Sequence, residues 1–168
     1  MGKIKSTLDI IMEKTKNLTL TPEEKEVLRR EDWLKKTRGR IQKFLDGAID
    51  LKRLREETRA EERPPGAEGV LKEELVGALN PEGDNESRFL ILKELFDTPI
   101  DPFREILQKG QKRLEEEKEK RNHELKEQLK TRGISGSAVL PNLALDPAWQ
   151  SAFQESLQSC REKCLALL

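Results

Sequence analysis

The sequence predicts an all-α protein: an elongated helical assembly with long amphipathic, coiled-coil-like helices and an irregular neutral strap before the C-terminal helix. Three observations predict this class. Charged residues make up 38% of the chain, against about 25% in ordinary globular domains. Hydrophobic residues make up only 35%, and they recur with a helical period. The chain has five Phe, two Trp and no Tyr, whereas sheets are rich in aromatic and β-branched side chains.

The N-terminal region, residues 1–62, is expected to hold a short helix and a long one. Apolar side chains recur at steps of three and four between Ile4 and Leu18, which is the spacing of one helical face. The sequence TPEE that follows predicts a helix start, because Thr21 can accept a hydrogen bond from the amide of Glu24 while Glu24 reaches back to Thr21. Pro22 would then occupy the first helical position, where its missing N–H costs nothing.

From this start a helical pattern continues to residue 62. An apolar side chain recurs every seven residues, with one more at the intermediate position, as in the heptad seam of a coiled coil: Val27, Leu34, Ile41 and Phe44. Arg30 and Thr37 interrupt the earlier half of this seam, and Gly39 and Gly47 each weaken a helix by about 1 kcal/mol relative to Ala. A single rod and a helical hairpin broken near a glycine both remain open.

Residues 63–69, RPPGAEG, are predicted to form a linker, because two prolines and two glycines end a helix. The C-terminal region, residues 70–168, begins with a short helix that carries three leucines on one face: Leu71, Leu75 and Leu79. The apolar run RFLILKELF at 88–96 is expected to be a helix rather than a buried strand, because no second strand is available to pair with it. Asp84, Asn85 and Ser87 are candidates for its N-cap.

The next helix is expected to extend from Asp101 to Arg132, with Asp101 as its N-cap and Pro102 at its first position. Gly133 is the expected left-handed residue that ends it. The final helix, residues 147–168, begins with the same Asp-Pro pair at Asp146. Its apolar stripe must be covered by this chain or by another, and consists of Trp149, Phe153, Leu157, Cys160, Cys164 and Leu168.

Residues 133–146 form the neutral strap, since no charged residue occurs from Gly133 to Leu145. Its small residues are expected to let the backbone lie close against a helix. Its larger apolar side chains would then fill the gap between helices: Val139, Leu140, Leu143 and Leu145. A ligand loop is the weaker interpretation, because GISGS lacks the Lys-Ser/Thr pair that a phosphate loop requires after its last glycine.

The sequence favours a non-enzymatic protein with no cofactor and no metal. Cys160 and Cys164 supply two thiolates at most, whereas a structural zinc needs four ligands. His123, the remaining soft ligand, lies in a highly charged segment, so the cysteines are expected to be free and buried. No stretch approaches the ~20 apolar residues of a membrane span, and no secretory signal is recognisable. Integral membrane association is therefore not expected, and a cytoplasmic location is.

Two functions are consistent with this pattern. The favoured one is a helical scaffold or adaptor that acts through a protein partner or self-association, with these candidate contact residues: Val27, Leu34, Ile41, Phe44, Trp149, Phe153 and Leu157. The alternative is a nucleic-acid- or ribosome-associated protein that contacts phosphates through the basic run 35–43: Lys35, Lys36, Arg38, Arg40 and Lys43.

The basic run has a third interpretation, as a patch that docks the acidic half of the same chain. Residues 1–60 hold 16 Lys and Arg against 11 Asp and Glu, and residues 61–168 hold 16 against 21. The two parts therefore attract each other. A solvated helical face or this docking patch is favoured over nucleic-acid binding.

The segments GKIKSTLDIIMEKT, TPEEKE and GISGSAVLPNL followed by DPAW resemble a small family of bacterial proteins of unknown function. The resemblance covers both ends of the chain and is less clear through the middle. It implies a bacterial, cytoplasmic setting and carries over no activity, cofactor or site residue.

Overall fold

The computed structural model describes residues 21–168, so the helix expected at 4–18 lies outside the described residues. Within residues 21–168 all regular structure is helical, which confirms the all-α class. A 3₁₀ turn, η1 (Leu143–Leu145), precedes the last helix. The α-helices are α2 (Pro22–Leu45), α3 (Leu51–Arg59), α4 (Ala67–Gly77), α5 (Glu86–Phe96), α6 (Asp101–Thr131) and α7 (Pro147–Leu165).

The start of α2 confirms the predicted capping box. The Thr21 hydroxyl accepts a hydrogen bond from the Glu24 amide at 3.2 Å, and the Glu24 carboxylate accepts one from the Thr21 amide at 2.8 Å. Pro22 occupies the first helical position. Two of the amides that a helix start leaves unpaired are therefore satisfied by local side chains.

The long N-terminal segment is a helical hairpin rather than one rod. Helix α2 ends at Leu45, and α3 begins at Leu51 and packs back against α2. Gly47 makes the turn with a φ of +72°, a conformation that favours glycine. Asp50 then caps α3 by accepting a hydrogen bond from the Arg53 amide at 2.8 Å. The heptad spacing therefore does not describe a continuous seam.

The N-terminal hairpin and the helices after the linker share one hydrophobic core. Helix α2 contacts α4 and α5, and α4 in turn contacts α7. The three leucines predicted on one face of the short helix are buried there, with Leu71 only 1% exposed. The predicted linker is shorter than expected, because α4 already begins at Ala67. Gly66 precedes it with a φ of +71°.

Residues 88–96 are helical, as predicted. None of the candidate caps, however, makes the usual N-cap hydrogen bond, in which the side chain of the N-cap residue accepts from an amide two or three residues later. Asn85 occupies the N-cap position without a side-chain cap bond. Its side chain is instead buried in the preceding loop, where it accepts from the Asn80 amide at 3.0 Å and donates to the Asn80 carbonyl at 2.7 Å. Asp84 accepts from the Glu86 amide at 3.0 Å. Asn85 therefore fixes the α4–α5 turn rather than the helix end.

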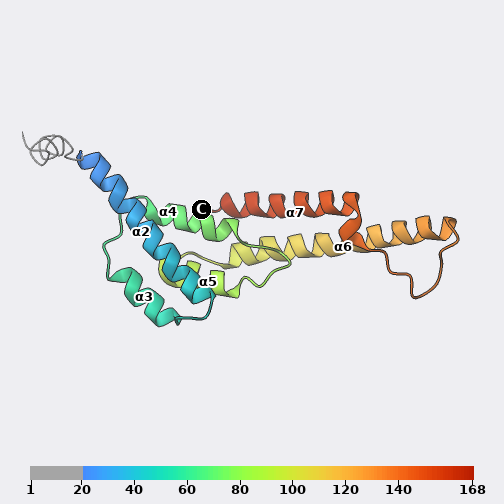
Figure 1. Ribbon diagram of the computed structural model, residues 1–168, viewed down its shortest axis with the longest axis horizontal. Coiled ribbons are helices and arrows are strands. Elements are labelled where there is room, and N and C mark those ends of the chain that lie inside the picture. The colour runs from blue at the N-terminus through green and yellow to red at the C-terminus, as the bar shows by residue number, and fades with distance from the viewer. Residues whose placement is uncertain (1–20) are drawn as a thin grey trace, which may run out of the picture.

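Helices α6 and α7 lie side by side and extend away from the other helices as an arm (Figure 1). The prediction that Asp101 is the N-cap of α6 is wrong. The helix starts one residue earlier than predicted, so Ile100 is the N-cap and Asp101 lies in the first turn. Gly133 ends α6 as predicted, with a φ of +81°. Its amide donates to the Lys130 carbonyl, and the Ile134 amide donates to the Leu129 carbonyl, both at 3.0 Å. These two bonds form a Schellman motif.

The two helices of the arm approach each other closely at Gly110 of α6 and Cys160 of α7. Gly110 is buried, and a Cβ atom placed there would overlap the Cys160 sulfur. The absence of a side chain at Gly110 therefore sets how near α7 can lie to α6. Near this point the seam is well buried, with Leu114 and Cys164 each 1% exposed.

Candidate interaction surfaces

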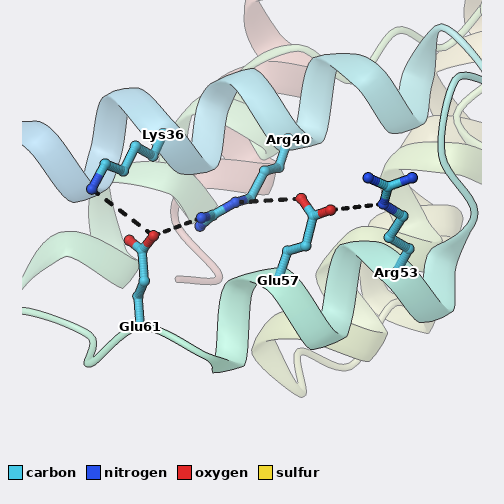
Figure 2. A network of polar contacts seen from close by, with 5 residues as sticks. All are labelled: Lys36, Arg40, Arg53, Glu57 and Glu61. Carbon is cyan, nitrogen blue, oxygen red and sulfur yellow. Dashed lines mark hydrogen bonds and ion pairs between the residues drawn. The ribbon is translucent and has the colours of Figure 1, made fainter.

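The basic run joins α2 to α3 through a network of ion pairs (Figure 2). Arg40 lies at its centre, 2.7 Å from the Glu61 carboxylate and 3.7 Å from that of Glu57. Lys36 also reaches Glu61, at 3.9 Å, and Arg53 reaches Glu57, at 2.7 Å. Arg40 is only 16% exposed in its side chain, so it contacts its own chain more than solvent.

These contacts hold both carboxylates in their charged form. The hydrogen bond from Arg40 lowers the pKa of Glu61 below its ordinary value, and the hydrogen bond from Arg53 lowers that of Glu57. A charged acceptor makes a stronger hydrogen bond than a neutral one. The network therefore contributes to closing the α2–α3 hairpin.

A second contact ties the basic run to α4. The Arg38 side chain donates from Nε to the Glu74 carboxylate at 2.9 Å and also makes a second hydrogen bond to it. Three of the five basic residues therefore meet carboxylates of this chain, which is the docking arrangement that the charge balance suggested. Lys35 and Lys43 are exposed.

Among the predicted contact residues on α2, the structure separates buried from exposed positions. Leu34 and Ile41 are each 7% exposed and belong to the core of this chain, and Phe44 packs partly buried against that core. Val27 is 55% exposed, next to Leu28 at 50%. Within residues 21–168, the most exposed apolar side chains of α2 therefore lie in its first turns.

The predicted contact residues of α7 lie along the arm. Trp149, Phe153 and Leu157 are each half-buried, and the rings of Trp149 and Phe153 are tilted with their centroids 6.0 Å apart. Helix α6 covers part of this stripe and leaves the rest accessible.

The cysteines of α7 are free and buried, as predicted. Burial raises the pKa of the Cys160 thiol and raises that of Cys164 to about 11. Both groups are therefore neutral thiols at physiological pH, whereas the thiolate is the nucleophile and the metal ligand.

An ion pair joins α6 to the residue that caps α7. Arg121 donates from two nitrogens to the Asp146 carboxylate, at 2.6 and 2.8 Å. The same carboxylate accepts from the Trp149 amide at 2.9 Å, which confirms Asp146 as the N-cap. The hydrogen bonds from Arg121, followed by the one from Trp149, lower the pKa of Asp146. The start of α7 is thus fixed to α6.

The neutral strap, residues 133–146, does not fill a gap between helices, so this expectation is wrong for its two most exposed leucines. Leu140 is 82% exposed and Leu145 is 77% exposed, and Ile134 is 48% exposed. Val139 and Leu143 are half-buried. Helices α6 and α7 contact each other directly, and Leu140 and Leu145 lie outside that contact, in the segment that joins the two helices. We call residues 133–146 the distal loop.

A groove of about 290 Å³ lies between the distal loop and the last turns of α6. Its apolar walls come from Leu125 and Leu129 of α6 and from Pro141 and Leu145 of the loop. Its polar lining comes from Gln128, Arg132, Asn142 and Asp146. The groove therefore has apolar walls from two segments and a polar rim.

Sequence reasoning did not identify the distal leucines as contact residues, although it singled out the stretch that contains them. The signal was the lack of charge from Gly133 to Leu145. Such a stretch is compatible with either a covered or an exposed loop, because burial depends on how α6 and α7 meet.

No protein-family model matches this sequence, and neither the curated proteins nor the solved structures gave a match. The resemblance to a bacterial family therefore stays a prediction, as does the cytoplasmic location. No helix within residues 21–168 has the length and apolar character needed to cross a membrane. In the same part of the chain, no three His, Cys, Asp or Glu side chains are grouped to hold a metal ion.

Proposed function

We propose that this protein is a non-enzymatic helical adaptor that holds a protein partner at the distal loop. The observation that carries the proposal is the exposure of Leu140 and Leu145, 82% and 77%, on a loop without charge from Gly133 to Leu145. Large exposed apolar side chains are typical of protein contact sites, and Leu145 also lines the groove beside α6.

The distal loop is also anchored at both ends. The Schellman motif at Gly133 fixes its start, and the Arg121–Asp146 ion pair fixes its end. A loop held in this way loses less conformational entropy when it binds, so more of the contact free energy appears as affinity. The neutral thiols of Cys160 and Cys164 further support a non-enzymatic role, because neither supplies a thiolate.

The proposal is tested by replacing the two leucines with a small polar residue. The double variant L140S/L145S is compared with the wild type and with L167S/L168S, which changes two leucines that are each 48% exposed outside the loop. Tagged proteins are crosslinked in native cells, and bound proteins are identified by mass spectrometry. We expect a protein recovered with the wild type and with L167S/L168S to be lost with L140S/L145S. An unchanged set of bound proteins in all three samples refutes the proposal.

The same samples separate the alternative function. If RNA or ribosomes are recovered, their retention should fall steeply with salt. Lys36, Arg38 and Arg40 pair with carboxylates of this chain. A further variant in which Lys35 and Lys43 are neutralised should therefore lose the bound RNA or ribosomes. That result would favour a nucleic-acid role over the adaptor.

A further inference from the structure

One side of α6 carries four charged residues at steps of four, three and four, which places them on one helical face: Arg113, Glu117, Lys120 and Glu124. We call this face the charged flank. Three of the four line a groove of about 160 Å³ that is completed by Arg121 and, from α7, by Ala148, Trp149 and Ala152. The charged flank therefore borders a half-buried aromatic ring and two small side chains.

The charges of this flank are self-complementary. In an antiparallel pair of identical helices related by a two-fold axis, residues equally far from the axis on either side face each other. With the axis between Lys118 and Glu119, Glu117 of one copy faces Lys120 of the other, and Arg113 faces Glu124. The symmetry repeats both contacts, so four pairs of opposite charge form across one interface. A parallel pairing in register would place like charges together.

The charged flank is accessible and retains unused charge. Among the described residues no ion pair is formed by Arg113, Glu117 or Lys120, whereas Glu124 pairs with Arg121 at 2.8 Å. Helix α5 is attached to the other side of α6, where Arg104 binds Glu86 at 2.7 Å. Arg104 is nine residues from Arg113, which is two and a half helical turns. The two side chains therefore leave α6 on opposite sides, and α5 does not cover the charged flank.

We propose that the charged flank is a self-association surface on which a second copy of this chain packs its own α6 in antiparallel orientation. The partner helix would also cover the exposed part of Trp149, and lysine stems pack favourably against such rings. The pairing places the two distal loops at opposite ends of the dimer, so that one dimer presents two docking sites.

This surface is separate from the distal loop, so the proposal goes beyond the adaptor function and does not depend on it. A dimer whose distal leucines bind nothing would leave the present proposal intact. A monomer that binds a partner through Leu140 and Leu145 would leave only the adaptor.

The test exchanges the two central charges, neither of which pairs within the described chain. E117K and K120E are the single variants, and E117K/K120E is the double variant with the wild-type net charge. The association of all four proteins is measured by analytical ultracentrifugation at low salt, and their helicity by circular dichroism. Each single variant turns two symmetry-related contacts from attraction to repulsion, so we expect its dissociation constant to rise about tenfold. In the double variant opposite charges face each other again, and we expect association close to that of the wild type.

Added salt should weaken the wild-type dimer, because exposed charges are screened. A wild type that stays monomeric at high micromolar concentration overturns the proposal. Single variants that associate as well as the wild type also overturn the proposal, because association would then depend on another surface. A double variant that associates as weakly as the single variants overturns it too, because the charges would then not face each other in an antiparallel pairing.

Discussion

The substitution G110A tests the close contact between α6 and α7. Alanine in a helix interior normally stabilises it by about 1 kcal/mol relative to glycine. At Gly110 the new Cβ would overlap the Cys160 sulfur, so the two helices or the cysteine must shift, and overpacking of this kind costs about 1–3 kcal/mol. We therefore expect G110A to lower the free energy of unfolding by about 1 kcal/mol, the opposite of the usual sign.

The variant C160A supplies the matched background. Without the sulfur, the nearest atom to the new Cβ outside the backbone of α6 is the Pro81 Cβ at 3.5 Å, an ordinary van der Waals contact. In the C160A background G110A should then stabilise the protein by about 1 kcal/mol, as in an unobstructed helix. The two substitutions are thus coupled by about 2 kcal/mol, well above the error of additivity for independent sites.

The assay is urea unfolding followed by circular dichroism, carried out on the wild type, both single variants and the double variant. The deciding quantity is the sign of the G110A effect in each background. If G110A stabilises the wild type as much as it stabilises C160A, the arm does not depend on the contact between Gly110 and Cys160.

Three further outcomes are expected. First, T37V should raise the free energy of unfolding by about 1 kcal/mol in urea unfolding, because Thr37 is fully buried and its hydroxyl has no hydrogen-bond partner among the described residues; a loss of stability would show that the hydroxyl is satisfied. Second, the lowered pKa of Asp146 means that its contribution to stability is present above its unfolded-state pKa and is lost as pH falls through its folded-state pKa. The protection factors of amides at the start of α7, which correct the exchange rates for their intrinsic pH dependence, should therefore fall with acid in the wild type, and D146N should remove that fall; equal behaviour of the two proteins would show that Asp146 does not hold the start of α7. Third, Cys164, whose pKa burial raises to about 11, should react with thiol reagents far more slowly in the native protein than in urea; equal rates would mean that α7 opens freely.

Local features of this fold were predictable because the residues that decide them are neighbours in the chain. The capping box of α2 needs only Thr21 and Glu24, three residues apart. The end of α6 needs Gly133 and the carbonyls of the preceding turn. Asp146 caps α7 in the same local way. In each case the hydrogen-bond partner lies within one helical turn, so the sequence contains the whole interaction.

Burial was predictable only in part, because it depends on contacts between distant segments. Leu34 is 7% exposed and Leu140 is 82% exposed, although both are leucines in positions that a packing argument would bury. Leu34 is covered because Gly47 folds α3 back on α2 and because α4 and α5 join that hairpin. Neither event leaves a signal around Leu34 itself.

The candidate surfaces were predicted in part. The uneven charge balance indicated that the basic run docks on acidic residues of the same chain, but the specific partners required the fold: Glu74 lies 36 residues after Arg38. The spacing of the α7 stripe placed Trp149 and Phe153 on one helical face, but it did not indicate that α6 would lie beside that face. The charged flank could have been found by testing α6 for opposite charges about a central point, since that pattern is written in residues 113–124.

The arm and the helices α2–α5 use their charges differently, and this difference bears on both proposals. Among α2–α5, most ion pairs join separate segments, as between Arg38 and Glu74 or Arg55 and Glu94, and fewer lie within one helix, as between Arg53 and Glu57. On α6 most described pairs lie within the helix itself, such as Lys112 with Glu116. Pairs of this second kind support the helix and hold no neighbour in place.

The outer arm consequently depends on few inter-helix contacts. Its fully buried seam along α6 ends at Leu114, and beyond that point the Arg121–Asp146 ion pair joins α6 to the start of α7. A region with half-buried side chains and exposed leucines opens more readily than a closed core. A partner that binds only the closed arm must therefore stabilise it. Occupation of the distal loop or the charged flank should slow hydrogen exchange in the outer turns of α6 and the first turns of α7 and leave α2–α5 unchanged.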